Sequence, residues 1–195
     1  MSIQDLIKFS ELLTQLQKTE RVIRVFGKDR WENDVEHSYM LAMLAWYFIE
    51  KEGLKLDKTK VIKYALAHDL VEAYAGDVYL YETDQKKKDE KHKKEKEAAE
   101  RIALEFPAFS ELHELVRGYE ERKDEESKFV YALDKVQPVI QIYLDKGRTW
   151  NEKKVSLKML VDAKKDKVAL SPAVNAVFNE LFEMLKGKDE LFEFK

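Results

Sequence analysis

Apolar residues recur at three- and four-residue spacing along almost the whole chain, which is the pattern of amphipathic helices. No segment shows the strict alternation that is typical of a strand. The pattern predicts an all-α fold, a helical bundle of about seven to nine helices. The predicted helices cover approximately residues 3–16, 34–52, 57–76, 85–106, 110–121, 124–146, 151–165 and 171–186.

Residues that begin or end helices support these boundaries. Asp34 and Asp57 are expected N-caps, because a carboxylate accepts hydrogen bonds from the first turn of a helix. Gly53 is expected to end the helix that begins near residue 34. Ser171–Pro172 combines a cap with proline at the first helical position. Pro138, inside the helix over 124–146, predicts a kink.

Two segments interrupt the apolar pattern. Residues 19–33 form a polar, arginine-rich connector, and residues 84–94 carry a dense run of lysine and acidic side chains. The charged run fits either a disordered linker or a solvated helix. We favour the helix, because helical apolar spacing resumes directly after it, from Ala98 to Phe106. Acids interrupt the lysines, so we expect no nucleic-acid partner.

Composition narrows the class of protein. The 195 residues suffice for one domain with a real core, and we expect one domain over 1–195. No stretch approaches the roughly 20 apolar residues of a membrane span, and the N-terminus lacks the order of a signal peptide. The chain has no cysteine, which favours a reducing, cytoplasmic location. A net charge of −3 gives no overall attraction to nucleic acid.

The chain has four histidines, and two of them stand in contexts that suggest chemistry. His92 lies in the lysine-rich run and is predicted to be a surface residue, and His113 is predicted to be a surface or half-buried helix residue. His37 lies at the beginning of an apolar helix, and His68 is followed by Asp69 on another. Taken singly, His37 also fits a hydrogen-bonded core residue, and a His–Asp pair occurs by chance.

Carboxylates near these histidines strengthen the case for a metal site. Glu72 lies four residues after His68, which places both on one face of a helix. Asp134 is the acid on an otherwise apolar helical face, where a buried carboxylate is unfavourable without a cation or a salt-bridge partner. Two imidazoles with carboxylates suit a divalent transition metal.

The order of these residues resembles the motif of the HD superfamily of metal-dependent phosphohydrolases: a His, a His–Asp pair and a distant Asp. The chain is most similar to the HD hydrolases that include the bacterial 5′-deoxynucleotidases. The likeness runs over about residues 5–150, through EHS, HDLVEAYAGDV, GYEER and ALDKV. It implies a single HD domain that residues 151–195 complete, and one divalent ion (Mn, Co, Zn, Fe, Ni or Mg) bound by His37, His68, Asp69 and Asp134.

The resemblance also implies the reaction. Residues matching Glu72 and Asp77 take part in catalysis in this subgroup, where they position water and protonate the leaving oxygen. The expected function is a 5′-nucleotidase that releases phosphate from (deoxy)nucleoside 5′-monophosphates. Alternatives are a cyclic-nucleotide phosphodiesterase, a triphosphohydrolase, or a non-catalytic metal- or nucleotide-binding module. A homodimer is a further expectation from the family, supported by surplus apolar residues in the last two helices.

A phosphate substrate also requires cationic side chains. The connector supplies Arg21, Arg24, Lys28 and Arg30, and arginine offers a planar fork to phosphate oxygens. We favour Arg24 and then Arg30 as phosphate ligands, with ordinary surface salt bridges as the alternative. The deoxynucleotidases place an Arg–Trp pair in this connector. Here Arg30 and Trp31 lie closer to the EHS segment than that pair does, and Trp31 either stacks on the base or packs a loop.

Overall fold

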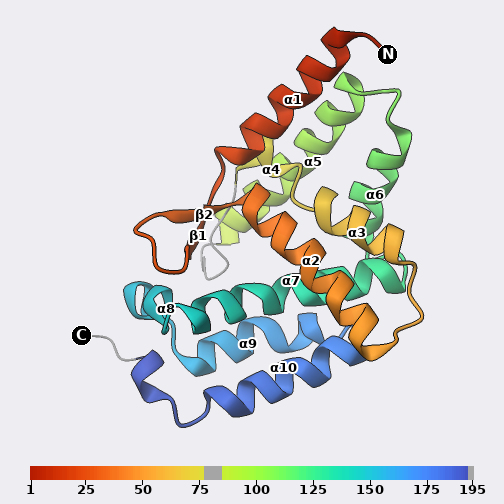
Figure 1. Ribbon diagram of the computed structural model, residues 1–195. Coiled ribbons are helices and arrows are strands. Elements are labelled where there is room, and N and C mark those ends of the chain that lie inside the picture. Colours follow the sequence, from red (N-terminus) through yellow and green to blue (C-terminus); the bar gives the residue numbers. More distant parts are fainter. Residues whose placement is uncertain (77–84, 193–195) are drawn as a thin grey trace.

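The computed structural model describes residues 1–76 and 85–192, with the backbone alone for 85–89. Helices make up most of it, which confirms the all-α prediction (Figure 1). None of the described helices is long and apolar enough to cross a membrane. The helices are α1 (Ile3–Gln17), α2 (Asp34–Glu52), α3 (Lys58–Ala67), α4 (Glu72–Ala75), α5 (Gln85–Glu105), α6 (Ser110–Glu121), α7 (Glu125–Leu144), α8 (Arg148–Lys153), α9 (Leu157–Val168), α10 (Pro172–Leu185) and the 3-10 turn η1 (Asp189–Leu191).

The arginine-rich connector between α1 and α2 is a small antiparallel hairpin, where the sequence predicts no strand. Its strands are β1 (Glu20–Arg24) and β2 (Trp31–Asn33). In β1 only Ile23 is buried, so the strand carries no apolar alternation for a sequence reading to detect. Contacts from elsewhere support the hairpin, including a hydrogen bond from Arg148 to the carbonyl of Val25.

The capping residues define where the site-bearing helices begin. Asn33, one residue before the predicted cap, caps α2 in a reciprocal box with Glu36: each side chain accepts a hydrogen bond from the other residue's backbone N–H. This arrangement places His37 in the first turn of α2. Gly53, in the left-handed conformation, ends α2, and Asp57 caps α3, both as predicted.

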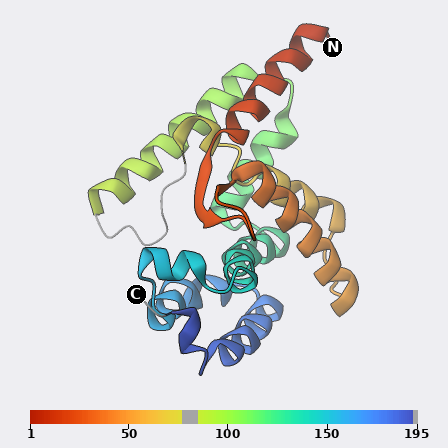
Figure 2. The same cartoon turned by 60° about the vertical axis from the view of Figure 1, so that its left-hand side comes forward.

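Two hydrophobic clusters fill the interior. The larger lies among α2, α3, α7, α9 and α10 and includes Leu41 and Phe129. The smaller lies among α1, α4, α5 and α6 and includes Leu12 and Ile102. Figures 1 and 2 show the two groups at opposite ends of the molecule, with α7 near the middle. The turn from α3 to α4, which carries the His–Asp pair, lies where the two clusters meet.

The charged run forms part of α5, so the helical interpretation is confirmed and the linker interpretation is wrong. Ala98 and Ile102 are buried, which anchors the second half of this helix in the smaller cluster. The predicted helix over 151–165 is instead two helices, α8 and α9. They are separated at Lys154, which adopts a left-handed conformation, and Ser156 caps α9. Helix α7 continues through Pro138.

Candidate metal centre

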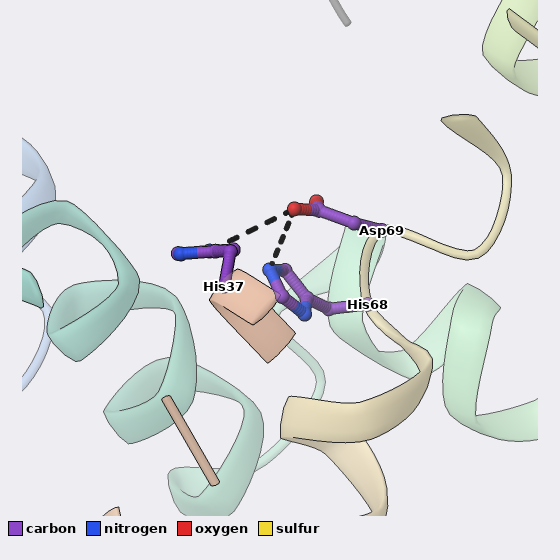
Figure 3. Close-up of side chains that lie close together, drawn as sticks. All are labelled: His37, His68 and Asp69. Atoms are coloured by element: carbon purple, nitrogen blue, oxygen red, sulfur yellow. Dashed lines mark ion pairs between the residues drawn. The ribbon is translucent and has the colours of Figure 1, made fainter. Parts of the chain in front are cut away.

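Three segments far apart in the chain bring the predicted metal ligands together. Figure 3 shows His37, His68 and Asp69 of this set. One ligand atom each from His37, His68 and Asp69 lies within 4.8 Å of the others. The Nε2 of His37 is 3.7 Å from Asp69 Oδ2 and 3.0 Å from Asp134 Oδ1. The Nε2 of His68 is 3.0 Å from Asp69 Oδ2 and 3.9 Å from Asp134 Oδ1. Two imidazole nitrogens thus face two carboxylate oxygens.

Hydrogen bonds on the far side of each ring determine which nitrogen faces the cluster. His68 Nδ1 lies 2.9 Å from the carbonyl oxygen of Ala65, which can only accept, so Nδ1 carries the proton. His37 Nδ1 lies 3.0 Å from Gln137 Oε1 and is oriented in the same way. Both Nε2 atoms can therefore offer lone pairs to the cluster. The buried Nε2 of His68 has no hydrogen-bond partner although a carboxylate oxygen is close.

The electrostatics keep the carboxylates ionised. Burial would raise the pKa of Asp134, but Lys135 and the imidazoles outweigh burial and lower this pKa well below its usual range. The pKa of Asp69 is also lowered, because nearby imidazole and guanidinium groups outweigh burial. Burial, together with the charge of Arg21, lowers the pKa of His37 to about 4. At pH 7 the cluster thus offers a neutral imidazole beside two anions.

This donor set fits a divalent metal ion. Burial would lower the pKa of His68, but the facing carboxylates outweigh it and raise this pKa, so positive charge is favoured at Nε2. Lone pairs of nitrogen and oxygen that face each other at 3 to 4 Å repel unless a cation lies between them. Neutral imidazole with carboxylate suits Mn, Fe, Co, Ni or Zn. The cluster could therefore hold one divalent ion.

Two buried side chains support the cluster and were missed by the sequence analysis. Gln137 accepts the hydrogen bond from His37, and Tyr119 donates a hydrogen bond from its hydroxyl to Asp134 Oδ2 at 3.1 Å. The signal for Gln137 was available, since it is a polar residue on the same apolar helix as Asp134. Tyr119 lies inside the GYEER segment, where it reads as an ordinary core aromatic.

A protein-family model described as HD domain matches residues 13–175. The chain belongs to the HD domain family. Curated relatives include 5′-deoxynucleotidase HDDC2 of Dictyostelium discoideum, which is 30% identical over 83% of this chain and 88% of the relative. The protein of the same name from Homo sapiens is 32% identical over 71% of this chain and 67% of its own. The 5′-deoxynucleotidase hdd1 of Schizosaccharomyces pombe is 27% identical over 77% of both chains.

Solved structures share the HD domain fold of this chain. A predicted metal-dependent phosphohydrolase from Magnetospirillum magnetotacticum MS-1 superposes with a TM-score of 0.84 at 24% identity, over 98% of this chain and 96% of that chain. The PH0347 protein from Pyrococcus horikoshii OT3 superposes with a TM-score of 0.62 at 23% identity, over 94% and 99%. At these identities the likeness shows the fold alone.

Glu72 lies at the edge of the cluster formed by the predicted metal ligands. It is the first residue of α4, and its side chain is 7% exposed. One ligand atom each from Glu72, Asp69 and Asp34 lies within 4.8 Å of the others. The Nζ of Lys91, on α5, is 3.6 Å from Glu72 Oε1. Asp77, the second predicted catalytic residue, lies outside the described residues.

Arg21 is an arginine that contacts the predicted metal ligands. Its Nη1 donates to Asp69 Oδ2 at 2.8 Å and to Asp34 Oδ1 at 3.2 Å, and its Nε lies 3.6 Å from Glu32. Among the described residues, no other arginine has an ion pair or hydrogen bond with one of the four predicted ligands. This guanidinium, with a side chain 12% exposed, is held beside the predicted metal ligands.

The two arginines favoured from the sequence lie elsewhere in the hairpin. Arg24 donates to Glu152 at 3.0 Å and lies over the Trp31 ring, 3.8 Å from its centroid. Arg30 makes a two-pronged contact with Glu36 on the surface. The structure brings neither into contact with the cluster, and their assignment to phosphate, like that of Trp31 to a base, stays a prediction.

Proposed function

We propose that this HD protein is a metal-dependent 5′-deoxynucleotidase that hydrolyses deoxynucleoside 5′-monophosphates to nucleosides and phosphate. The observation that carries the proposal is the pair of buried imidazoles whose Nε2 atoms face two ionised carboxylates. The relatives named 5′-deoxynucleotidase support the substrate class, because they align over two thirds or more of their length.

Each group of the cluster has a proposed role. The residues that would hold the ion are His37, His68, Asp69 and Asp134. When bound, a divalent ion supplies Lewis-acid activation of water and of a phosphoryl oxygen. The carboxylates neutralise part of its charge, and the protonated Nδ1 of each imidazole keeps the ring from turning away.

Arg21 is proposed to orient the phosphate. A phosphomonoester brings roughly two negative charges at neutral pH. The guanidinium of Arg21 is fixed by Asp69 and Asp34, so it is preorganised beside the reaction centre. Its planar fork is suited to phosphate oxygens, and charge that develops on these oxygens in the transition state is stabilised by a cation already in place.

Glu72 is proposed to act on the attacking water. Its carboxylate is buried within reach of the cluster, and a carboxylate there can accept a proton from water or orient the water toward phosphorus. Asp77 is then given the other role that the resemblance implies for this pair, protonation of the leaving oxygen. In this proposal Glu72 takes a proton from the attacking water or orients it, and Asp77 gives a proton to the leaving oxygen.

The test is phosphate release by metal-stripped protein after addition of Mn, Co, Zn, Fe, Ni or Mg. The panel contains the deoxynucleoside and ribonucleoside 5′-monophosphates, with cyclic nucleotides and triphosphates beside them. We expect release from deoxynucleoside monophosphates that requires metal. Glu72→Gln should reduce kcat by about 100-fold or more, as expected for loss of a general base. Glu97→Gln, an exposed acid on α5, is the matched control.

Two outcomes would contradict the proposal. Release from cyclic nucleotides or triphosphates alone, with metal bound, would assign the protein to another class of HD phosphohydrolase. Release from no nucleotide by protein that binds the metal with a defined stoichiometry would make it a metal-binding module.

A further inference from the structure

Helix α5 carries the densest run of charge in the chain, and its charged side chains differ sharply in exposure. The side chains of His92 and Lys93 are 79% and 77% exposed. Those of Lys91 and Glu95 are 27% and 15% exposed. Residues four apart lie on one face of a helix, so Lys91 and Glu95 form an inward-facing pair in a segment that otherwise reads as solvated.

The inward pair connects α5 to the candidate active site. The Nζ of Lys91 lies 3.3 Å from Glu95 and 3.6 Å from Glu72 Oε1. The side chain of Glu72 is only 7% exposed, so Lys91 contacts a nearly buried acid. Burial raises the pKa of Glu95, although Lys91 opposes this effect. Lys91 therefore lies between two carboxylates, and one of them, Glu72, belongs to the candidate active site.

We propose that Lys91 is a second phosphate-binding cation of the substrate site, acting beside Arg21. Arg21 contacts Asp69, and Lys91 contacts Glu72, three residues further along the same turn. Ligand atoms of these two acids lie within 4.8 Å of each other. The two cations therefore reach the same small patch of carboxylates.

The charge of this patch explains why a second cation is needed. A phosphate dianion that approaches Asp69 and Glu72 is repelled unless cations offset them. Arg21 already pairs with three acids, Glu32, Asp34 and Asp69. Lysine carries its ammonium on a flexible stem, so Lys91 can keep Glu72 as one partner and turn a donor from another partner toward a phosphate oxygen. Glu95 pairs with the same ammonium and holds it on the inward face of α5.

The test compares Lys91→Met with Lys93→Met on the same helix, and it rests on the proposed function only in part. Binding of inorganic phosphate to metal-loaded protein is measured by calorimetry, and KM and kcat are measured with deoxynucleoside monophosphates. Lys91→Met should weaken phosphate binding and raise KM by at least about tenfold, the loss of one charge-assisted hydrogen bond. Lys93→Met should change neither, and Lys91→Arg should restore most of the affinity.

Other results would overturn the proposal. A fall in kcat with unchanged KM and unchanged phosphate affinity would show that Lys91 acts only on Glu72. Equal behaviour of Lys91→Met and Lys93→Met would show that the inward lysine has no role in binding. Absence of turnover on any nucleotide, with phosphate still bound and the difference between the two variants retained, would remove the proposed function and leave the anion site standing.

Discussion

His37 and His68 each keep one ring proton in a hydrogen bond that points away from the cluster, and this detail decides what the cluster can bind. For His68 the acceptor is a carbonyl of its own helix. For His37 the acceptor is the side chain of Gln137, which a substitution can remove. An imidazole whose Nδ1 is held in this way is a better Nε2 ligand, because neither the tautomer nor the ring orientation must change on binding.

Replacement of Gln137 by leucine should therefore weaken metal binding. We expect a loss of about 10- to 100-fold in affinity, the range for removal of such a supporting hydrogen bond. Competition with a chromophoric chelator measures this loss without reference to catalysis. Gln137→Glu keeps an acceptor and should stay closer to wild type, and Gln141→Leu, one turn along α7, should have no effect. Equal affinities for Gln137→Leu and wild type would show that the amide does not position His37.

Glu32 gives a second prediction at this scale, concerning pH. Burial raises its pKa to about 7, against 4.5 for an ordinary glutamate. Between these values the unfolded chain loses the proton first, so this group lowers stability as pH rises from about 4.5 to 7. In metal-free protein, Glu32→Gln should gain stability over wild type through that window, by up to about 3 kcal/mol.

Urea unfolding at several pH values measures the difference for Glu32. The contrasting variant is Glu36→Gln. Arg30 lowers the pKa of Glu36, so its carboxylate stabilises the protein above the ordinary pKa and the variant should lose stability there. A Glu32→Gln difference that does not vary with pH would mean that Glu32 is ionised in both states.

At the scale of elements, local patterns predicted most of the helices but not the connector. Gly53 ends α2 and Asp57 caps α3 through contacts with residues next to them in the chain, so both roles could be predicted from the sequence. The hairpin depends on partners distant in sequence. In the folded hairpin Arg21 contacts Asp69, whereas Arg24 contacts Glu152 on α8, so the two arginines lie against different parts of the molecule. Without the strand, no sequence pattern distinguishes the arginine beside the cluster from the one against α8.

The connection from α7 to α8 gives a prediction at this scale. Gly147 has φ of +73°, and a Cβ there would lie 2.2 Å from the backbone oxygen of Leu191. Gly147→Ala should destabilise the protein by about 2 to 3 kcal/mol, since backbone must shift as well as adopt a strained conformation. Gly187 has φ of +74° with nothing near, so Gly187→Ala measures the conformational part alone. Equal losses of stability for the two variants in thermal unfolding would show that the backbone at Leu191 moves aside without a cost in free energy.

At the scale of the whole molecule, the candidate centre lies at the meeting of two hydrophobic clusters. Its ligands come from α2, the turn after α3, and the middle of α7. The set was predicted because the order of these residues, a His, a His–Asp pair and a distant Asp, resembles the HD motif. Gln137 could have been noticed as a polar residue on the same apolar helix as Asp134, but the roles of Tyr119 and Lys91 depend on which helices pack together.

Metal binding should consequently stabilise the fold as a whole. At a free metal concentration of about 100 times Kd the gain is about 2.7 kcal/mol, which corresponds to roughly 5 to 10 °C in Tm for a chain of this size. Asp134→Asn should abolish most of this shift, whatever its effect on the metal-free protein. Asp162→Asn, at an exposed position, should retain it. A full shift in Asp134→Asn would exclude Asp134 from the ligand set.

The contact between His37 and Asp134 spans 97 positions of the chain. An ion held by both residues would therefore act as a reversible cross-link in a protein that has no cysteine with which to build a permanent one. Closing a loop of this length restricts the unfolded chain by several kcal/mol in the chain-entropy model, about 4 to 5 for a covalent link. Chelation would remove the ion and open that loop without breaking a covalent bond of the chain. The supply of metal would then set how long the protein survives proteases as well as whether it turns over substrate.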